Sequence, residues 1–309
     1  DEYINEVLSQ AGKSSQKMKI VIDCGNGSAG IVAPKLMRKL GHEVVELFCE
    51  IDGNFPNHHP DPGKIVNLQD LIRVVKSEVA DIGIAFDGDG DRLGVVTNSG
   101  EIIYPDQLMM IFSKEVLKTN QGKGIVFDVK CTNLLAEIIS EAGGTPIMAA
   151  TGHFHIKNML KKTNAPLAGE MSGHIFFNDQ WYGFDDAHYS AFRLIEIIKD
   201  SGCSLEVLMQ DLPKAFSTPE LNLNVEESKK FKIVQDFISK SNFDDGKKIT
   251  IDGLRVNFDD GWGLLRASNT TPKLVLRFEA KSPNRLNEIK NMFLNQLKTI
   301  DETINIELS

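Results

Sequence analysis

The sequence predicts an α/β protein: two consecutive α/β domains with mixed, mainly parallel sheets, followed by an α+β domain with an antiparallel sheet. Short apolar runs alternate with helical segments through the first two thirds of the 309 residues, which is the pattern of parallel α/β layers. After Pro213, short strands follow one another across Asp-Gly turns, which favour hairpins. Pro105 suits the first turn of a helix and marks an earlier joint. We therefore predict domains over residues 1–104, 105–213 and 214–309.

The elements expected in each block follow from where the apolar runs begin and end. An amphipathic helix at the start precedes strands over 18–23, 43–48 and 81–86, helices over 31–40 and 64–79, and a hairpin of 93–97 with 101–104. The second block should contain strands over 124–127, 145–149 and 165–168 and helices over 132–142, 153–162 and 185–199. The third should contain helices over 226–239 and 284–299 and strands over 221–225, 248–251, 254–258, 263–267 and 274–280.

Composition and charge narrow the class of protein. A hydrophobic content of 41% and a charged content of 25% are ordinary for a globular protein. The net charge of −9 disfavours nucleic acid or an anionic membrane as a partner, although the local field of a cleft can still attract an anionic substrate. No apolar run approaches the length of a membrane span. The four cysteines show neither C-x-x-C nor zinc spacing, and three of them lie in or beside apolar runs, so we expect reduced, buried thiols in a cytoplasmic protein.

The motif richest in chemistry is Asp87-Gly-Asp-Gly-Asp-Arg92, which follows an apolar run expected to be a buried strand. Alternate side chains of an extended segment point the same way, so Asp87, Asp89 and Asp91 can converge. Three carboxylates repel one another unless a cation lies among them, and oxygen-only ligation suits Mg²⁺. Arg92 offers a guanidinium fork for a phosphate beside that metal. The motif therefore predicts a metal site for phosphoryl transfer.

Three other interpretations of this motif are weaker. A solvated acidic turn would need no metal. An EF-hand loop requires Gly at its sixth position and Glu at its twelfth, where this chain has Arg92 and Asn98. A phosphatase with an aspartate nucleophile would also place Asp-x-Asp after a strand, with Lys130 and the pair Asp185-Asp186 as its remaining groups. The hydroxyl usually found two residues beyond the second aspartate is, however, replaced by Asp91.

A glycine motif, Gly25-Asn-Gly-Ser-Ala-Gly30, formally matches G-x-G-x-x-G between a strand and a helix. Glu46 follows about 20 residues on, as in a dinucleotide-binding fingerprint. The metal motif would have no role in such a site, and the third block does not resemble the substrate domain of a dehydrogenase. We therefore favour a tight strand-to-helix turn in which glycines leave room for the backbone.

A second polar motif, Gly169-Glu-Met-Ser-Gly-His174, lies in a loop between strands. Glu170, Ser172 and His174 occupy alternate positions and can face the same side. A carboxylate, a hydroxyl and an imidazole together suit the recognition of neighbouring hydroxyl groups, as on a sugar ring. A lone loop histidine is usually structural, but three alternating polar groups between glycines favour binding.

A third motif, Arg266-Ala-Ser-Asn-Thr-Thr-Pro272, joins two expected strands. It combines a guanidinium, three hydroxyls, a side-chain amide and free backbone N–H groups, and it contains no acidic residue. Many donors and one positive charge match a phosphate, so we predict an anion-binding loop. A hairpin turn rich in Thr and Asn is the alternative.

Isolated basic residues give weaker signals. Lys130 and His153 follow expected strands, at the ends where α/β domains place ligands. Either could take part in proton transfer, His153 by its ordinary pKa and Lys130 only if its pKa is depressed. We interpret His155 and His188 as structural, and Asn57-His-His-Pro60 as a poor metal site because adjacent side chains diverge in an extended chain.

The three motifs, in this order and spacing, resemble the α-D-phosphohexomutases, in particular the bacterial phosphomannomutase/phosphoglucomutase branch. The resemblance runs from about residue 17 to the end, and residues 52–62 and 183–186 support it. The Glu-Met-Ser form of the second motif is similar to the mannose/glucose-specific branch. The resemblance implies a four-domain, Mg²⁺-dependent enzyme with a central cleft. Such an enzyme moves a phosphoryl group between its phosphoserine and mannose or glucose 1- and 6-phosphates through a hexose 1,6-bisphosphate.

The resemblance also implies a role for each motif residue. The metal ligands would be Asp87, Asp89 and Asp91, and Arg92 would contact the reacting phosphate. Sugar hydroxyls would be read by Glu170 and Ser172, with His174 nearby. The distal phosphate would be held by Arg266, Ser268, Asn269 and Thr270. Lys130 and His153 would line the cleft, where one of them would assist proton transfer.

The family's serine nucleophile lies in a first-domain loop, Thr-Ala-Ser-His-Asn-Pro, that this sequence does not contain. The segment at 57–60 matches it only superficially. The resemblance thus implies domains II, III and IV over the three predicted blocks, without the phosphoryl donor and the fourth metal ligand. The first residue is not Met, so we expect a piece of a longer protein. Because the phosphoserine is missing, we expect Mg²⁺ to be weakly held or absent and the chain alone to give no turnover. A non-catalytic phosphosugar-binding fragment is the alternative.

Overall fold

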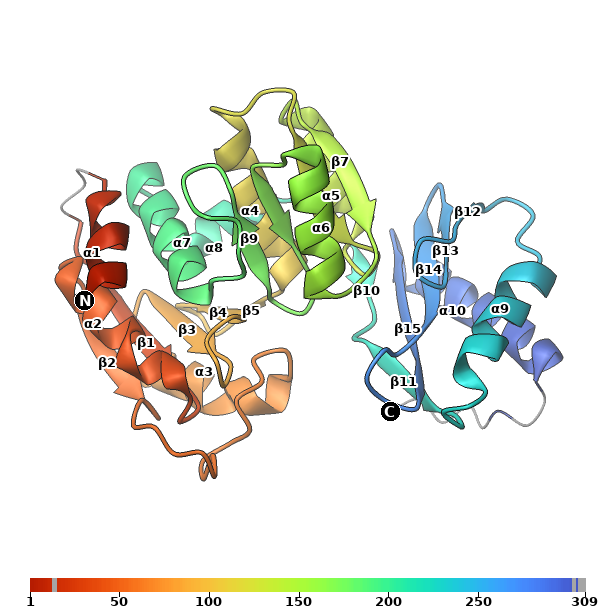
Figure 1. Ribbon diagram of the computed structural model, residues 1–309, viewed down its shortest axis with the longest axis horizontal. Coiled ribbons are helices and arrows are strands. Elements are labelled where there is room, and N and C mark those ends of the chain that lie inside the picture. The colour runs from red at the N-terminus through yellow and green to blue at the C-terminus, as the bar shows by residue number, and fades with distance from the viewer. Residues whose placement is uncertain (13–15, 302–303, 305–309) are drawn as a thin grey trace. The chain divides into compact units, whose positions relative to one another are not determined.

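The computed structural model describes residues 1–12, 16–301 and 304, which form two compact units (Figure 1). Unit 1 consists of Asp1–Phe127, Leu135–Ile147 and Gly152–Leu212. Unit 2 consists of Asp128–Leu134, Met148–Thr151 and Pro213–Ser309. Two short segments from the middle of the chain therefore belong to the C-terminal unit. None of the helices in the described residues has the length and apolar character needed to cross a membrane.

The first sheet of unit 1 is mixed, with the strand order β2-β1-β3-β4-β5. Its strands are β1 (Lys19–Asp23), β2 (Glu43–Leu47), β3 (Ile82–Phe86), β4 (Leu93–Thr97) and β5 (Ile102–Ile103). β1 pairs in parallel with β2 and β3, whereas β3, β4 and β5 run antiparallel in sequence. The accompanying helices are α1 (Glu2–Ser9), η1 (Ser28–Ile31), α2 (Ala33–Lys39), η2 (Ile65–Leu68) and α3 (Gln69–Ser77). Leu71 and Val75 of α3 pack on Val21, Ala85 and Val96, so the apolar face of α3 covers this sheet.

The second sheet has the order β7-β6-β8-β9. Its strands are β6 (Gly124–Asp128), β7 (Thr145–Ala149), β8 (Leu167–Gly169) and β9 (Ile175–Phe177). β6 and β8 are parallel, and β8 and β9 are antiparallel. The helices of this part are α4 (Pro105–Leu117), α5 (Asn133–Glu141), α6 (His153–Thr163), α7 (Ala187–Ser201) and α8 (Leu205–Gln210). Pro105 is the first residue of α4, as predicted.

The third sheet, in unit 2, is antiparallel throughout, with the order β10-β15-β14-β13-β12 and β11 paired to β15. Its strands are β10 (Phe216–Ser217), β11 (Leu221–Asn224), β12 (Lys247–Ile249), β13 (Leu254–Phe258), β14 (Gly261–Ala267) and β15 (Lys273–Ala280). Helices α9 (Lys230–Lys240) and α10 (Pro283–Ile300) pack on it through a core that includes Phe237, Phe278 and Phe293. The predicted fold class is confirmed.

Several element boundaries differ from the prediction. The helices expected over 31–40 and 64–79 each begin with a 3₁₀ turn, because the entering chain tightens before the α-helical hydrogen bonds start. The helix expected from 226 starts at Lys230, after a turn. The short elements β10 and α8 were not expected, since two and six residues are too few to show a period.

Candidate active site

The acidic motif forms the hairpin loop between β3 and β4, and one buried carboxylate organises it. The Oδ1 atom of Asp87 accepts hydrogen bonds from the backbone N–H groups of Gly90, Asp91 and Arg92 at 3.0–3.1 Å. Its Oδ2 atom accepts one from Nε of Arg92 at 2.6 Å. The loop therefore curls around Asp87, which is 2% exposed.

The predicted convergence of the three aspartates is present, although its cause differs from the prediction. Oxygen atoms of Asp87, Asp89 and Asp91 all lie within 4.8 Å of one another. They meet because the loop turns around Asp87, and not because an extended chain alternates its side chains. Asp89 is exposed and Asp91 half-buried, so a cation can reach the cluster from solvent. Three carboxylates with room for water ligands fit the coordination that Mg²⁺ prefers.

Arg92 is fixed between two carboxylates. Besides the bond to Asp87, its Nη1 atom lies 3.2 Å from Oδ1 of Asp61. Burial alone would lower the pKa of Arg92, but the neighbouring Asp87 and Asp61 raise it above its ordinary value. Asp61 was not among the predicted site residues. Its only signal was its place in the stretch 52–62 that supports the family resemblance.

The second polar motif lies directly against the acidic loop. Arg92 and His174 form an antiparallel bridge, and the backbone N–H of Leu93 donates to the carbonyl of Gly173 at 3.1 Å. Two motifs that are about eighty positions apart in the printed sequence are thus joined through the backbone within unit 1. The fold therefore presents the candidate metal ligands and the candidate sugar-binding residues as one surface.

Glu170, Ser172 and His174 do come together, but they bond to one another. The hydroxyl of Ser172 donates to Oε2 of Glu170 at 3.0 Å and lies 2.9 Å from Nδ1 of His174. His174 also lies 3.0 Å from Glu170 through Nδ1 and 3.4 Å from Asp91 through Nε2. Burial alone would lower the pKa of His174, but hydrogen bonds to Asp91 and Glu170 raise it to about 9. Burial would raise the pKa of Glu170, but its bonds to His174, Gly152 and Ser172 lower it.

The remaining residues around this surface are held by local contacts. His153, the first residue of α6, is exposed, and its ring centroid lies 6.0 Å from that of His174. Asp185 pairs with Lys157 at 2.9 Å and also lies within 4.8 Å of ligand atoms of Asp91 and His174. His188 is half-buried and stacks on Phe86, in line with a structural role. His155 is exposed and packs edge-to-face on Phe154.

The glycine motif serves packing. A Cβ atom on Gly27 would lie 2.7 Å from the carbonyl oxygen of Gly88 in the acidic loop, and one on Gly30 would lie 2.0 Å from the carbonyl oxygen of Cys49. The glycines are therefore needed where two backbones approach closely. Glu46, the residue a dinucleotide ribose would require, forms an ion pair with Arg38. These contacts account for the motif as the tight strand-to-helix turn that the sequence predicts.

His58 forms a hydrogen-bonded pair with Asp23. Its Nε2 atom lies 3.1 Å from Oδ2 of Asp23, a carboxylate that is 1% exposed at the end of β1. The hydrogen bond that His58 donates to the carboxylate of Asp23 raises the pKa of His58, against a smaller lowering by burial. His59 packs edge-to-face on Phe55. The two adjacent histidines therefore have separate partners, as the sequence predicts.

The Asp23–His58 pair predicts a pH-dependent stability. The folded pKa of His58 lies above the unfolded value of about 6.5, so its stabilisation is fully present below that value and is lost as the pH rises through the folded pKa. His58→Gln is expected to lower the free energy of unfolding by roughly 0.5–1 kcal/mol at pH 5.5 and by less at pH 9. Urea unfolding at both pH values measures the difference. In an Asp23→Asn background, His58→Gln should change the free energy of unfolding by the same amount at both pH values. If its effect still differed between the two pH values as in the unsubstituted chain, the pairing would be disproved.

In unit 2, Arg266 is the next-to-last residue of β14 and the first residue of the third motif. Its Nε atom donates to Oδ2 of Asp252 at 2.9 Å, and its side chain is 5% exposed. Its Nη2 atom is buried without a hydrogen-bond partner among the described residues. An unpaired buried guanidinium N–H is costly, so this atom is an open donor for an anion. Arg266 therefore keeps one unpaired donor, and its role as a phosphate ligand stays a prediction.

The rest of the third motif forms the hairpin loop between β14 and β15. The Oγ atom of Ser268 accepts from the backbone N–H groups of Thr270 and Thr271 at 3.4 and 3.2 Å and from the Thr271 hydroxyl at 2.8 Å. Asn269 and Thr270 are exposed at the tip. The loop is therefore shaped by Ser268, while its exposed donors remain available to a ligand.

Lys130 also belongs to unit 2 and retains its charge. Its Nζ atom lies 3.0 Å from Oε2 of Glu220. Burial alone would lower its pKa, but Asp128 and Glu220 raise it above the ordinary value, while Arg266 acts in the opposite direction. The condition for proton transfer by Lys130, a depressed pKa, is therefore not met. Lys130 and Arg266 are instead two cations close enough to affect each other.

A buried cation holds the loop that carries Lys130. Nη1 of Arg255 donates to the carbonyls of Val129 and Cys131, the latter at 2.8 Å, and Nη2 donates to Oδ1 of Asn133 at 2.6 Å. The guanidinium of Arg255 lies 3.7 Å from the ring centroid of Trp262. Burial lowers the pKa of Arg255 to about 10, which leaves it charged at neutral pH. This support could not be predicted from the sequence, because two of its three hydrogen-bond acceptors are backbone carbonyls and all three lie far from Arg255 in sequence.

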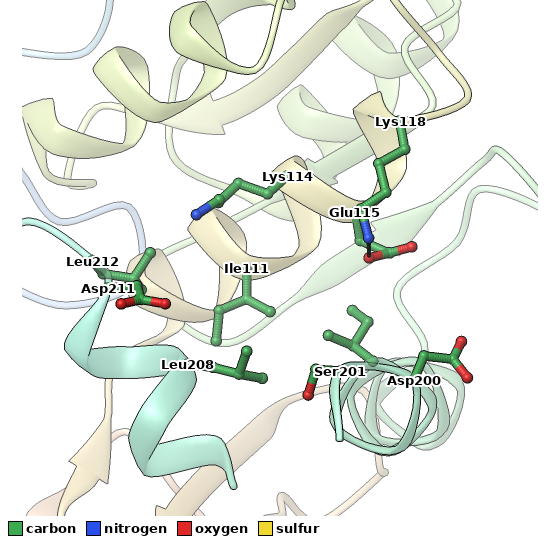
Figure 2. A pocket seen from close by; sticks show the side chains of 10 residues that line it. Ile111, Lys114, Glu115, Lys118, Asp200, Ser201, Leu208, Asp211 and Leu212 are labelled. Atoms are coloured by element: carbon green, nitrogen blue, oxygen red, sulfur yellow. Dashed lines mark hydrogen bonds and ion pairs between the residues drawn. The ribbon is translucent and has the colours of Figure 1, made fainter. Parts of the chain in front are cut away.

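A surface pocket of unit 1 lies away from this chemistry. It has a volume of about 200 Å³, and Figure 2 shows Ile111 and Lys114 of α4 opposite Leu208 of α8, with Asp200 and Ser201 of α7 nearby. None of its lining residues belongs to the three motifs. The pocket is lined by apolar side chains together with both lysines and acidic residues, so its chemistry does not indicate a particular ligand.

Comparison with known proteins agrees with the motif geometry. The model of phosphoglucomutase/phosphomannomutase alpha/beta/alpha domain II matches residues 1–100, that of domain III matches 104–216, and that of the C-terminal domain matches 220–296. A phosphomannomutase/phosphoglucomutase from Pseudomonas syringae is 54% identical over 300 residues, covering 97% of this chain and 64% of the relative. One from Pseudomonas aeruginosa is 54% identical over 290 residues, covering 94% of this chain and 63% of the relative.

Solved structures have the same fold. A phosphoglucomutase/phosphomannomutase family protein from Burkholderia thailandensis is 50% identical, with a TM-score of 0.93 over 99% of this chain and 65% of the other. An N-acetylphosphoglucosamine mutase from Aspergillus fumigatus, solved with GlcNAc-6P and magnesium, matches with a TM-score of 0.67. It covers 96% of this chain and 68% of the other, but at 14% identity it shows the fold alone. The chain spans less than two thirds of the length of the Pseudomonas syringae and Pseudomonas aeruginosa relatives. By sequence, fold and motif geometry, the chain belongs to the phosphoglucomutase/phosphomannomutase family, whose domains II, III and IV it matches in order.

Proposed function

We propose that this chain is the metal- and substrate-binding part of a phosphomannomutase/phosphoglucomutase, an isomerase that interconverts mannose or glucose 1-phosphate and 6-phosphate. The reaction would proceed through a phosphoserine enzyme and a hexose 1,6-bisphosphate. The antiparallel bridge between Arg92 and His174 carries the proposal, because it joins an acidic phosphoryl-transfer loop to a loop suited to sugar hydroxyls. The 54% identity to phosphomannomutase/phosphoglucomutases from two Pseudomonas species supports it.

Within unit 1, we assign Asp87, Asp89 and Asp91 as ligands of Mg²⁺. When bound, Mg²⁺ would neutralise charge on the transferring phosphoryl group. Arg92 would contact that group with the guanidinium N–H groups not used by Asp87 and Asp61, stabilising charge that develops on its oxygens. Because Arg92 is already held by two carboxylates, little conformational entropy remains to be lost when it binds.

The second motif would orient the sugar. Glu170 and Ser172 would exchange part of their mutual hydrogen bonding for bonds to sugar hydroxyls, and His174 would remain a cation between Asp91 and Glu170. His153, exposed beside His174, is the candidate for proton transfer to or from a sugar oxygen. Lys130 is not assigned that task, because its pKa is raised.

Unit 2 would hold the phosphate that does not react. Arg266 offers its open Nη2 donor, and Ser268, Asn269 and Thr270 form the loop that follows. Lys130 adds a second positive charge to this unit. The ligands would be the 1- and 6-phosphates of mannose and glucose and their 1,6-bisphosphates. In the distant Aspergillus fumigatus enzyme, complexes with GlcNAc-6P and glucose 1,6-bisphosphate have been solved.

The domain division and the location complete the proposal. We assign domain II to residues 1–104, domain III to 105–213 and domain IV to 214–309, a division that the three matched family models support. The four cysteines are free thiols, two of them buried, as is usual in a reducing compartment, which supports a cytoplasmic location.

A chimera tests the proposed activity. The part of the Pseudomonas aeruginosa relative that lies before the region matched here would be fused to this chain. The fusion is expected to interconvert glucose 1-phosphate and glucose 6-phosphate in the presence of Mg²⁺ and a hexose 1,6-bisphosphate. A coupled dehydrogenase assay measures glucose 6-phosphate formation, and the same assay with a mannose 6-phosphate readout gives the sugar preference.

Asp89→Asn in the chimera is the matched control, because Asp89 is exposed and its replacement should not disturb folding. Losing one of three anionic ligands is expected to weaken Mg²⁺ about tenfold or more, seen as a raised Mg²⁺ requirement. A chimera that folds, binds hexose phosphate and gives no turnover would refute the mutase proposal and favour a phosphosugar-binding role.

A further inference from the structure

Two cysteines outside the motifs lie side by side at the carboxyl ends of neighbouring parallel strands. Cys24 follows β1 and Cys49 lies two residues beyond the end of β2. Their Sγ atoms are 3.5 Å apart. Cys24 is fully buried, whereas Cys49 is half-buried and accessible to a small reagent. The remaining two cysteines are not partners of this pair in the described contacts, since Cys131 bonds to Asp128 and Cys203 is exposed on α7's C-terminal side.

Both cysteines are connected to the acidic loop through the glycine motif. The carbonyl of Cys24 accepts from the N–H of Gly27 at 2.7 Å, and the N–H of Ser28 donates to the carbonyl of Gly88 at 2.9 Å. The backbone of Cys49 packs so closely on Gly30 that a Cβ there would lie 2.0 Å from its carbonyl oxygen. Any displacement of these two cysteines must therefore be taken up by a turn that is already packed against the loop of the three aspartates.

We propose that Cys24 and Cys49 form an oxidation site for hydroperoxides, and that closing their disulfide displaces the acidic loop and weakens its hold on divalent metal. The first part is independent of the proposed function, whereas the metal consequence rests on the proposed Mg²⁺ site.

The chemistry has two balanced steps. Cys49 gives up its thiol proton as its sulfur attacks the terminal oxygen of a hydroperoxide, the O–O bond breaks, and the departing alkoxide (or hydroxide) takes up that proton, so that a sulfenic acid and an alcohol (or water) form. The Cys24 thiol then attacks the Cys49 sulfur, the S–S bond forms, and the sulfenic oxygen leaves as water. One hydroperoxide is reduced by two electrons and two thiols are oxidised by two electrons. A cellular dithiol restores both cysteines by thiol–disulfide exchange.

The geometry assigns each sulfur its step. Cys49 is the one that a hydroperoxide reaches, so it reacts first. The hydrogen bond to Cys49 and burial raise the pKa of the Cys24 thiol, so Cys24 stays protonated until its neighbour has been oxidised. A disulfide is about 2.05 Å long, so the two sulfurs must approach by about 1.5 Å from their separation of 3.5 Å. The turn at residues 25–30 is closely packed, so this movement requires the backbone to shift.

The test begins with the full 309-residue chain treated with hydrogen peroxide and then with iodoacetamide. Mass spectrometry of the digested protein is expected to show a peptide pair cross-linked through Cys24 and Cys49, which a dithiol reagent separates. Cys49→Ser should abolish the cross-link, whereas Cys203→Ser should leave it unchanged. Modification of Cys49 without a cross-link to Cys24, or no reaction at this pair, would overturn the oxidation site.

The second measurement uses Mn²⁺, whose free-ion EPR signal reports binding to oxygen ligands. Peroxide treatment is expected to weaken Mn²⁺ binding at least threefold in the unsubstituted chain and not in Cys49→Ser, with recovery on reduction. If the disulfide forms and Mn²⁺ binding is the same in both redox states, the coupling to the acidic loop is wrong. If untreated chain binds no Mn²⁺ at all, the failure lies in the proposed metal site, and the cross-link result still decides the oxidation site.

Discussion

A polypeptide of these 309 residues is expected to give no measurable turnover of mannose 1-phosphate, even with Mg²⁺ and a hexose 1,6-bisphosphate present. The proposed reaction needs a hydroxyl that carries a phosphoryl group between two sugar oxygens. The second motif contains one hydroxyl that could be considered for this task, that of Ser172, which donates to Glu170 and lies beside His174. Because His174 has a pKa of about 9, it holds a proton at neutral pH and does not act as the base that would activate Ser172.

Ser172 is the alternative nucleophile whose activity would contradict this expectation. Ser172, His174 and Asp91 lie in series at 2.9 and 3.4 Å, an arrangement that superficially resembles a nucleophile, a base and an orienting carboxylate. Release of mannose 6-phosphate would be followed with the purified chain and, in parallel, with Ser172→Ala. Turnover in the first protein that vanishes in the second would contradict the expectation and identify Ser172 as the nucleophile.

Arg266→Ala is expected to weaken glucose 6-phosphate binding to the chain by roughly 10- to 150-fold, which corresponds to about 1.5–3 kcal/mol for the loss of charge-assisted hydrogen bonding. The expectation rests on the Nη2 atom of Arg266, which is buried and unpaired among the described residues. Isothermal titration calorimetry with glucose 6-phosphate, and with inorganic phosphate as a smaller probe, measures the effect. Affinity within about twofold of the unsubstituted chain would remove Arg266 from the site.

Two variants control for effects other than the lost donor. Arg266→Lys keeps the positive charge but loses the guanidinium fork, so it should recover part of the affinity. Arg285→Ala removes another arginine of unit 2, one that pairs with Asp260 and Glu288 outside the third motif. It should bind glucose 6-phosphate normally. Weakening by Arg285→Ala as large as by Arg266→Ala would point to a general effect of positive charge.

The local features of the fold and site were predictable because their causes are local. The acidic motif lies between two apolar strands, so its position and the clustering of its carboxylate oxygens could be predicted from consecutive residues, although the loop turns around Asp87 and is not extended as expected. Likewise, the Asp-Gly turns of the third block predicted hairpins, and the strands on either side of these turns are antiparallel. Glycines 27 and 30 were recognised as serving a tight turn, since dinucleotide binding left the acidic motif without a role.

The features that escaped prediction depend on contacts between distant parts of the chain. The bridge between Arg92 and His174 arises only when β4 and the loop before β9 meet, and no periodicity reports that meeting. The pairing of Arg92 with Asp61 has the same origin. The raised pKa of Lys130 depends on Asp128 and also on Glu220, and Glu220 lies ninety positions away in the printed sequence, so the direction of this pKa shift could not be predicted from the sequence alone.

The anchoring of the Lys130 loop by Arg255 has a practical consequence for dissecting the protein into separately expressed pieces. A cut at the proline joint near 213 looks natural from the sequence. It would, however, leave the Val129 and Cys131 carbonyls without their donor and Arg255 without its acceptors. Neither half would then keep the contacts that it makes in the whole chain. Studies of the isolated C-terminal block should instead supply the residue 128–134 segment in some form, for example as a tethered peptide.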